Sequence, residues 1–150
     1  MSGSFTALFY HIVFSTKDRR PLLHRETAPR IHEYLGGIML GMGGISIKVG
    51  GATDHIHVLG SISKTLAIAS AIRDLKADSS KWIHKTFPAL RDFAWQQGYG
   101  AFSISVTGLD AVKRYIEHQE EHHRAVSFQE EFLDFLQRHQ IAYDPRYIWL

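Results

Sequence analysis

The sequence predicts an α+β fold in which an antiparallel four-stranded sheet carries two helices on one face. Three observations predict it: an aromatic and β-branched run near the N-terminus, two short alternating runs around a glycine-rich turn, and apolar residues at helical spacing in the segments between strands. In chain order these elements read βαββαβ, the arrangement of ferredoxin-like and RRM-like folds. That order leaves the second face of the sheet open for a ligand or another element.

The first half of this core is expected to form one strand and one helix. The strand covers Phe5 to Thr16, because aromatic and β-branched residues favour extended backbone. The helix runs from about Thr27 to Leu40, where apolar residues recur at helical spacing. Glycine supplies five of the residues from 36 to 44, but the Lys-Ser/Thr pair of phosphate-binding loops does not follow. We interpret this stretch as a flexible connection.

Two strands, a helix and a fourth strand complete the core. Ile45 to Val49 and His55 to Leu59 flank a turn, and this pattern predicts a hairpin. The second helix is expected from about Lys64 to Lys85, with Ser63 as its N-cap. The fourth strand is Tyr99 to Val106.

The residues after the core are predicted to be largely helical. Capping-box patterns begin at Thr107 and Ser127, so helices are expected over about 108–123 and 128–139. The tail from 141 to 150 is aromatic and irregular, and it either docks on a surface or is loose. We interpret residues 1–150 as one domain with a core (5–107), a tyrosine-bearing helix on the other sheet face (108–123), and a C-terminal helix and tail (127–150).

Composition excludes several classes of protein. The chain has 150 residues, of which 45% are apolar and 21% charged, as in folded globular proteins. It has no cysteine, which excludes a disulfide scaffold, a Cys-ligated zinc site and a cysteine nucleophile. It contains no run of about 18 apolar residues and no basic segment typical of a secretory signal. We therefore expect a cytoplasmic protein.

Charge and aromatic residues together indicate a nucleic-acid partner. Residues 1–107 carry 12 Lys and Arg against 7 Asp and Glu, whereas residues 108–150 carry 5 against 8. A basic body of this kind favours a polyanionic partner. Single-stranded nucleic acids are bound by cations that contact the phosphate backbone and by aromatic rings that stack on the bases. For Trp82 and Tyr99 the alternative is a place in the core. The candidate residues are Lys17, Arg19, Arg20, Lys76 and Lys85, with Trp82, Trp95 and Tyr99.

The segment Asp54-His55-Ile56-His57-Val58 is the most informative motif. Side chains alternate faces along a strand, so His55 and His57 point to one face and the apolar pair to the other. If the apolar pair packs under the helices, both imidazoles lie on the open face, where they can chelate one divalent metal. The alternative is two half-exposed surface histidines.

A second group lies on the helix expected over 108–123. Tyr115, His118, Gln119 and His122 follow the spacing of one helix face. A helix packed over the open face of the sheet would present this row to the strand histidines. The alternatives are a surface stripe of mixed polarity, or a separate metal pair formed by His118 and His122.

These motifs resemble the single-tyrosine HUH transposases, IS200-like enzymes of small insertion sequences that act on single-stranded DNA. The resemblance covers about residues 5–135. The Asp54–Leu59 segment resembles the HUH motif, in which U is apolar, although Thr53 stands where the family usually has proline. Tyr115-Ile116-x-x-Gln119-x-x-His122-His123 resembles the helix that carries the nucleophile. The other resembling segments are Tyr10–Lys17, Arg19–Leu23, Leu75–Ser80 and Trp95–Tyr99.

The resemblance implies a DNA transposase with a metal-dependent tyrosine mechanism. His55, His57 and Gln119 would hold Mg²⁺ or Mn²⁺, and Tyr115 would cleave and rejoin single-stranded DNA through a 5′-phosphotyrosine intermediate. It also implies recognition of DNA hairpins at element ends and action at the bacterial or archaeal nucleoid. A homodimer is expected as well, with sites assembled within one chain or between two. The apolar run of the first strand adds to this expectation, because it is suited to pairing across a sheet edge.

Four alternatives remain open. A domesticated relative would act on repeat sequences without mobility. A non-enzymatic module that binds single-stranded RNA or DNA would use aromatic residues on the open face, and histidines there argue against it. A two-histidine phosphodiesterase requires a second His-x-Ser/Thr, which is missing between residues 86 and 107. Replication initiators and relaxases also use an HUH motif, but their domains usually exceed 150 residues and often use a third histidine.

Overall fold

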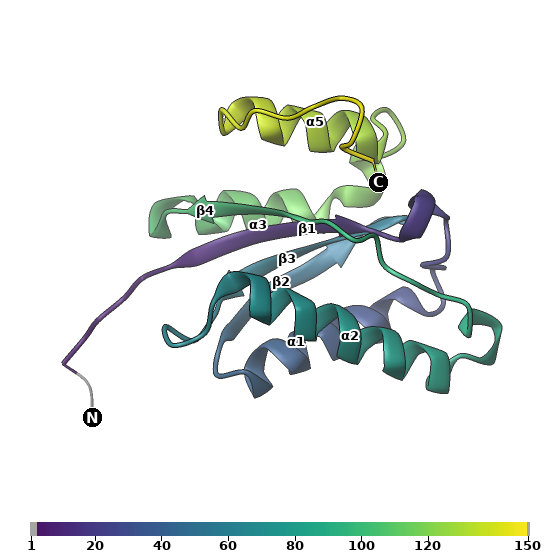
Figure 1. Ribbon diagram of the computed structural model, residues 1–150, viewed down its shortest axis with the longest axis horizontal. Coiled ribbons are helices and arrows are strands. Elements are labelled where there is room, and N and C mark those ends of the chain that lie inside the picture. Colours follow the sequence, from purple (N-terminus) through teal and green to yellow (C-terminus); the bar gives the residue numbers. More distant parts are fainter. Residues whose placement is uncertain (1–2, 150) are drawn as a thin grey trace.

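The computed structural model describes residues 3–149 and contains one four-stranded antiparallel sheet (Figure 1). The strands are β1 (Phe9–Ser15), β2 (Ile45–Gly51), β3 (His55–Ser61) and β4 (Gly100–Ile104), in the spatial order β2-β3-β1-β4. The α+β fold with the order βαββαβ is therefore confirmed. Each strand differs by a few residues from its expected limits, most at the N-terminus, where pairing begins only at Phe9.

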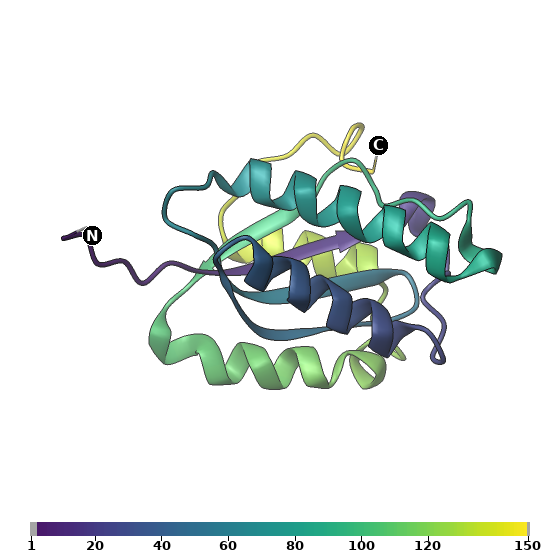
Figure 2. The same ribbon diagram turned by 90° about the horizontal axis from the view of Figure 1, so that it is seen from below.

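Helices cover both faces of the sheet, as Figures 1 and 2 show. On one face lie α1 (Ala28–Gly41) and α2 (Ile68–Thr86). On the other lie α3 (Leu109–Glu117), the single turn α4 (Gln119–His122) and α5 (Phe128–Arg138). The face that the core order leaves open is thus occupied by the C-terminal elements. Among the described residues, no helix has the length and apolar character needed to cross a membrane.

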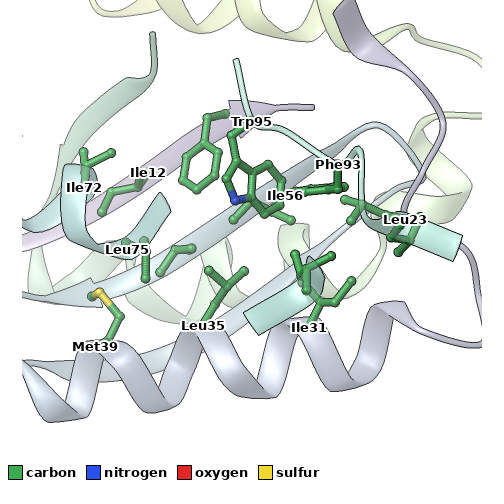
Figure 3. Packing of buried hydrophobic residues seen from close by; sticks show 14 residues of the cluster. Ile12, Leu23, Ile31, Leu35, Met39, Ile56, Ile72, Leu75, Phe93 and Trp95 are labelled. Carbon is green, nitrogen blue, oxygen red and sulfur yellow. The ribbon is translucent and has the colours of Figure 1, made fainter. Parts of the chain in front are cut away.

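The main core fills the layer between the sheet and the helices α1 and α2 (Figure 3). Alternate residues of the two central strands point into it, Ile12 and Phe14 from β1 and Ile56 and Val58 from β3. Full burial of such a side chain stabilises the fold by about 1.5–3 kcal/mol. Because these residues face α1 and α2, their strand neighbours must face α3 and α5.

A second, smaller core lies between the sheet and α5. Four apolar residues of α5 pack over Val13 and Phe102, namely Phe128, Phe132, Phe135 and Leu136. The end of the tail joins this cluster through Ile148 and Trp149, so the tail docks on α5. The Ser127 side chain accepts a hydrogen bond from the Glu130 N–H and completes the expected capping box.

The other two expected helix caps are wrong, although α3 begins within a residue of its expected start. Helix α2 begins after Ala67, because Ser63 pairs with the Thr65 hydroxyl in a local turn instead of capping a helix. Thr107 does not cap α3, because its hydroxyl pairs with that of Ser105. The short 3-10 turn Val106–Gly108 leads into α3 in its place.

The helix expected over 108–123 is interrupted at His118, whose φ and ψ are −106° and 24°. Helix α3 ends before it and α4 begins after it, so Tyr115 and Gln119 belong to different helices. The expectation that strand one offers a sheet edge is also wrong. Strand β1 pairs with β3 on one side and β4 on the other, and the edges belong to β2 and β4.

Candidate metal and tyrosine site

Strand alternation brings three histidines to the sheet face beneath α3 and α5. His55 and His57 come from β3 and His11 from β1, and all three are buried. Their strand neighbours Ile56 and Val58 are in the main core, which confirms the expected division of faces. These imidazoles are therefore not half-exposed surface groups, and other groups must fix their orientation.

Two contacts orient the rings of the HUH pair. Nδ1 of His55 lies 2.7 Å from Oδ1 of Asp54, so the carboxylate fixes that ring and directs its Nε2 into the site. Nδ1 of His57 lies 2.7 Å from Nε2 of His11, and the two rings stack. A partner on the other ring nitrogen is typical of metal-binding histidines, because it fixes tautomer and ring plane.

The interrupted helix brings Tyr115 and Gln119 to the same place. The Tyr115 ring centroid lies 5.8 Å from that of His57, and the half-buried hydroxyl is 3.2 Å from Nε2 of His122. Oε1 of the buried Gln119 lies 3.0 Å from Nε2 of His55. The turn at His118 points that residue outward, where its ring bonds to the carbonyl of Arg114. The two histidines of the alternative metal pair thus have separate partners, because His122 contacts the Tyr115 hydroxyl.

A buried carboxylate from α5, Glu131, occupies the centre of the site. Its side chain is 2% exposed. One oxygen, Oε1, lies 3.1 Å from Nε2 of His57. The other, Oε2, accepts hydrogen bonds from the Tyr115 hydroxyl and, at 3.1 Å, from the Gln119 amide. Glu131 thus joins the tyrosine, the amide and the histidines.

Burial and the Glu131 charge control the pKa values of the site. Burial lowers the pKa of His57 to about 4 and that of His11 to about 3, so both rings are neutral at pH 7. Burial raises the pKa of Tyr115, and its hydrogen bond to Glu131 raises it further. Burial opposes the charge of Glu131, but the hydrogen bond from His57 and the close His123 ring hold its pKa well below the usual range. A neutral hydroxyl therefore faces an ionised carboxylate.

Sequence reasoning missed the contributions of His11, His123 and Glu131. The signal for Glu131 is its position on α5, where it interrupts the apolar stripe formed by Phe128, Phe132 and Phe135. A carboxylate on the apolar face of an amphipathic helix must find polar partners in the interior. His11 carries a similar signal, because it interrupts an apolar strand.

The candidate DNA-binding cations differ in their surroundings. Lys17, Arg20 and Lys85 are exposed. Arg19 lies over the Trp149 ring, with its guanidinium carbon 5.4 Å from the centroid. The Lys76 ammonium donates to the carbonyls of Gln96, Gln97 and Gly98, and burial lowers its pKa to about 8. Lys76 therefore stabilises the backbone of residues 96–98.

Trp82 and Trp95, two of the candidate stacking rings, are engaged within the fold. Trp82 stacks on Tyr34 with centroids 4.2 Å apart, and Trp95 is buried against Phe14 and Phe93. Tyr99 is 37% exposed. A row of exposed rings for stacked bases is therefore not formed by these three residues.

The donors in the site fit a divalent metal. The imidazole nitrogens of His55 and His57 and the amide oxygen of Gln119 converge around Glu131. Imidazole and oxygen donors suit divalent ions such as Mn²⁺, and two neutral imidazoles with an amide leave the ion its full charge. The sequence prediction therefore groups residues that the fold does bring together.

Comparisons with known proteins agree with the fold. The sequence pattern of the family described as "Transposase IS200 like" matches residues 4–119. The chain is 26% identical over 122 residues to the ISDra2 transposase TnpA of Deinococcus radiodurans, which covers 78% of this chain and 87% of that protein.

Two solved structures share the fold. One is a candidate transposase of Deinococcus radiodurans R1, 24% identical, with a TM-score of 0.66 over 79% of this chain and 95% of that chain. The other is a REP-associated tyrosine transposase bound to a REP hairpin, 14% identical, with a TM-score of 0.59 over 84% and 76% of the two chains. On the extent of the family match, the chain belongs to the IS200-like transposases.

Proposed function

We propose that this transposase cleaves and rejoins single-stranded DNA, with Tyr115 as the nucleophile. The observation that carries the proposal is the convergence of the Tyr115 hydroxyl, the Gln119 amide and the His57 imidazole on the single carboxylate of Glu131. An anionic phosphodiester placed among the same groups would meet a nucleophile and a metal site together. A tyrosine with a purely structural role does not need several polar groups around its hydroxyl, because one hydrogen bond satisfies that hydroxyl.

In this proposal His55, His57 and Gln119 hold one divalent ion, Mg²⁺ or Mn²⁺. When bound, the ion polarises the scissile phosphate and holds it in line for attack. Asp54 and His11 keep the two imidazoles in the orientation that ligation requires. The tyrosine needs this help because its ordinary pKa is about 10 and its burial beside Glu131 raises the pKa further.

The bond changes balance without an energy source. The Tyr115 hydroxyl releases its proton to solvent as its oxygen forms a bond to the phosphorus. The bond from phosphorus to the 3′-oxygen breaks, and this oxygen takes up a proton from solvent and leaves as a free 3′-hydroxyl. The product is a 5′-phosphotyrosine ester, which conserves the energy of the broken bond. Attack by a 3′-hydroxyl on another strand reverses the step and releases Tyr115.

The expected substrate is single-stranded DNA next to a hairpin at an element end. The REP-associated transposase with a related fold is bound to a hairpin, and this supports a folded single strand as the partner. Such a substrate places the protein at the nucleoid in the cytoplasm. We also expect a homodimer, as the family resemblance implies.

A non-enzymatic module on the same sheet is less well supported. A stacking platform needs an accessible sheet face, but α3 and α5 cover this one and bury His55, His57 and Phe102.

The position of α3 and α5 over the sheet also affects catalysis. For DNA to reach Tyr115, Glu131 must leave the hydroxyl that it holds.

The deciding experiment is incubation with labelled single-stranded DNA from the flanks of the chain's own gene, with Mg²⁺ or Mn²⁺. We expect an adduct that resists SDS and maps to a peptide containing Tyr115. Tyr115→Phe should form no adduct and retain DNA binding, whereas Tyr143→Phe, which changes an exposed tail residue, should react normally.

The two possible roles of the Tyr115 hydroxyl differ in their consequences. Loss of a purely structural hydroxyl bonded to a carboxylate would cost about 1.5–3 kcal/mol of stability and leave cleavage intact. An adduct on another tyrosine, or normal cleavage by Tyr115→Phe, would refute the proposal.

A further inference from the structure

We propose that His123 and Glu131 are additional ligands of the metal, so that helix α5 forms part of the metal site. The proposal rests on the metal site of the proposed function and extends it from three protein ligands to five. It goes beyond the HUH pair and Gln119, because it assigns a role to residues that sequence reasoning did not select.

The first observation is the geometry around one oxygen of Glu131. Oε1 lies 3.1 Å from Nε2 of His57, 3.4 Å from Nε2 of His55 and 3.2 Å from Nε2 of His123. The four donor atoms lie within 4.8 Å of one another. Bonds of about 2.0–2.2 Å from a metal to nitrogen or oxygen place opposite ligands about 4.0–4.4 Å apart. Small side-chain shifts therefore bring all four donors to one ion.

The second observation is the state of His123. Its side chain is 9% exposed, and Nε2 is buried without a hydrogen-bond partner, because the contact with Glu131 is close but misaligned. A buried imidazole nitrogen without a partner has lost its hydrogen bonds to water, and no protein hydrogen bond replaces them. Ligation of a cation by the lone pair of this nitrogen would restore that interaction.

The third observation is the kind of partner that surrounds Glu131. Within residues 3–149 its ion pairs are formed with histidines alone, namely His55, His57, His122 and His123. A buried carboxylate is normally paired with a positive charge or bound to a metal. A divalent cation among these imidazoles would supply one, and the Gln119 amide and Tyr115 hydroxyl would hold the second oxygen.

This donor set leaves room for substrate. Three imidazole nitrogens, one carboxylate oxygen and the Gln119 amide oxygen make five ligands, and a six-coordinate ion keeps one position for a phosphate oxygen. Imidazole-rich sites suit Mn²⁺ better than Mg²⁺, which prefers oxygen ligands and retains water. Mn²⁺ is therefore the probe for the test.

The test is calorimetric titration of Mn²⁺ into the metal-free protein, without DNA. Glu131→Gln keeps the size of the side chain and removes its charge, and we expect its Kd for Mn²⁺ to rise at least tenfold. His123→Gln should weaken binding in the same direction. Asp134→Asn is the matched control: it removes a carboxylate from the exposed side of the same helix, where Asp134 pairs with Arg138. Its Kd should equal that of the wild type.

Pulsed EPR of bound Mn²⁺ provides a second measurement. The wild type should show three coordinated imidazole nitrogens and His123→Gln two. If Glu131→Gln does not fold, Glu131→Asp, which withdraws the carboxylate by one methylene, should weaken binding instead. An unchanged Kd in both Glu131 variants, or two nitrogens in the wild type, would overturn this proposal alone. A wild type that binds no Mn²⁺ would overturn the metal site of the proposed function as well.

Discussion

Ile116 of α3 lies directly against the backbone of Gly50 in β2. A β-carbon built on Gly50 would be 2.7 Å from Cγ2 of Ile116 and 3.1 Å from its carbonyl oxygen. Gly50 pairs with His57 across the sheet, and Tyr115 precedes Ile116 in the helix. The absence of a side chain at one strand position therefore determines how closely the tyrosine approaches the metal site.

Gly50→Ala should push α3 away from the sheet. Overpacking of this kind costs about 1–3 kcal/mol of stability, and the displaced tyrosine should form its DNA adduct more slowly. Urea unfolding and the rate of adduct formation measure the two effects. Gly37→Ala is the matched control, because Gly37 lies inside α1 with open space around it. Alanine there should stabilise the protein by about 0.5–1 kcal/mol and leave the adduct rate unchanged. Equal adduct rates in the two variants would contradict the role assigned to Gly50.

Binding of single-stranded DNA should weaken steeply with salt, because phosphate contacts release counterions. The exposed Lys17 and Arg20 are the expected phosphate contacts in the turn after β1. Their double replacement by alanine should reduce the slope of log K against log salt by about 1.4, at about 0.7 per contact. Lys76→Met should behave differently and mainly lower stability, because the ammonium holds three carbonyl groups. Fluorescence anisotropy over a salt series measures the slope, and a flat response of the wild type would exclude this mode of binding.

The strand faces were predictable from sequence, because alternation is a local property of the chain. Ile56 and Val58 had to enter the apolar layer, and their burial sent His55 and His57 to the opposite face. The proximity of Gln119 to His55 depends instead on the turn at His118. That turn breaks the regular helical spacing on which the sequence prediction relied, yet it still directs the amide into the site.

The position of α5 could not be derived from local patterns. Its capping box and apolar stripe predict a helix with a buried face, but they do not say which surface it covers. The covered surface decides the role of Glu131, because the same carboxylate over another apolar surface would have no histidine partners. At Ser63 and Thr107 a local pattern predicted an interaction that the fold does not form. Each matched a capping pattern, but a nearby hydroxyl was a closer partner.

His32 should make stability depend on pH in the acid range. Burial lowers its pKa to about 4 from 6.5, and nearby Lys48 adds to the effect. The unfolded chain therefore binds a proton before the folded protein does, so stability is full above pH 6.5 and is lost as the pH falls towards 4. At pH 5 the loss attributable to this group is about 2 kcal/mol.

His32→Gln, which does not titrate, should show a correspondingly smaller loss of stability between pH 7.5 and pH 5. Urea unfolding at the two pH values provides the comparison. Equal losses in the variant and the wild type would show that His32 is not responsible.

The tyrosine and the histidines of the site should belong to the same chain when the protein acts. The Tyr115 ring lies 5.8 Å from the His57 ring within one chain, and both contact the same Glu131. Sedimentation velocity should show the expected homodimer. Tyr115→Phe and His57→Ala proteins, mixed under conditions that exchange subunits, should then recover no cleavage, because each chain lacks one half of its own site. Two different affinity tags verify that heterodimers form, and circular dichroism verifies that His57→Ala is folded. Sites assembled between chains would leave one of the two heterodimer sites complete, so recovery of cleavage upon mixing would show that α3 and its tyrosine serve the histidines of the partner.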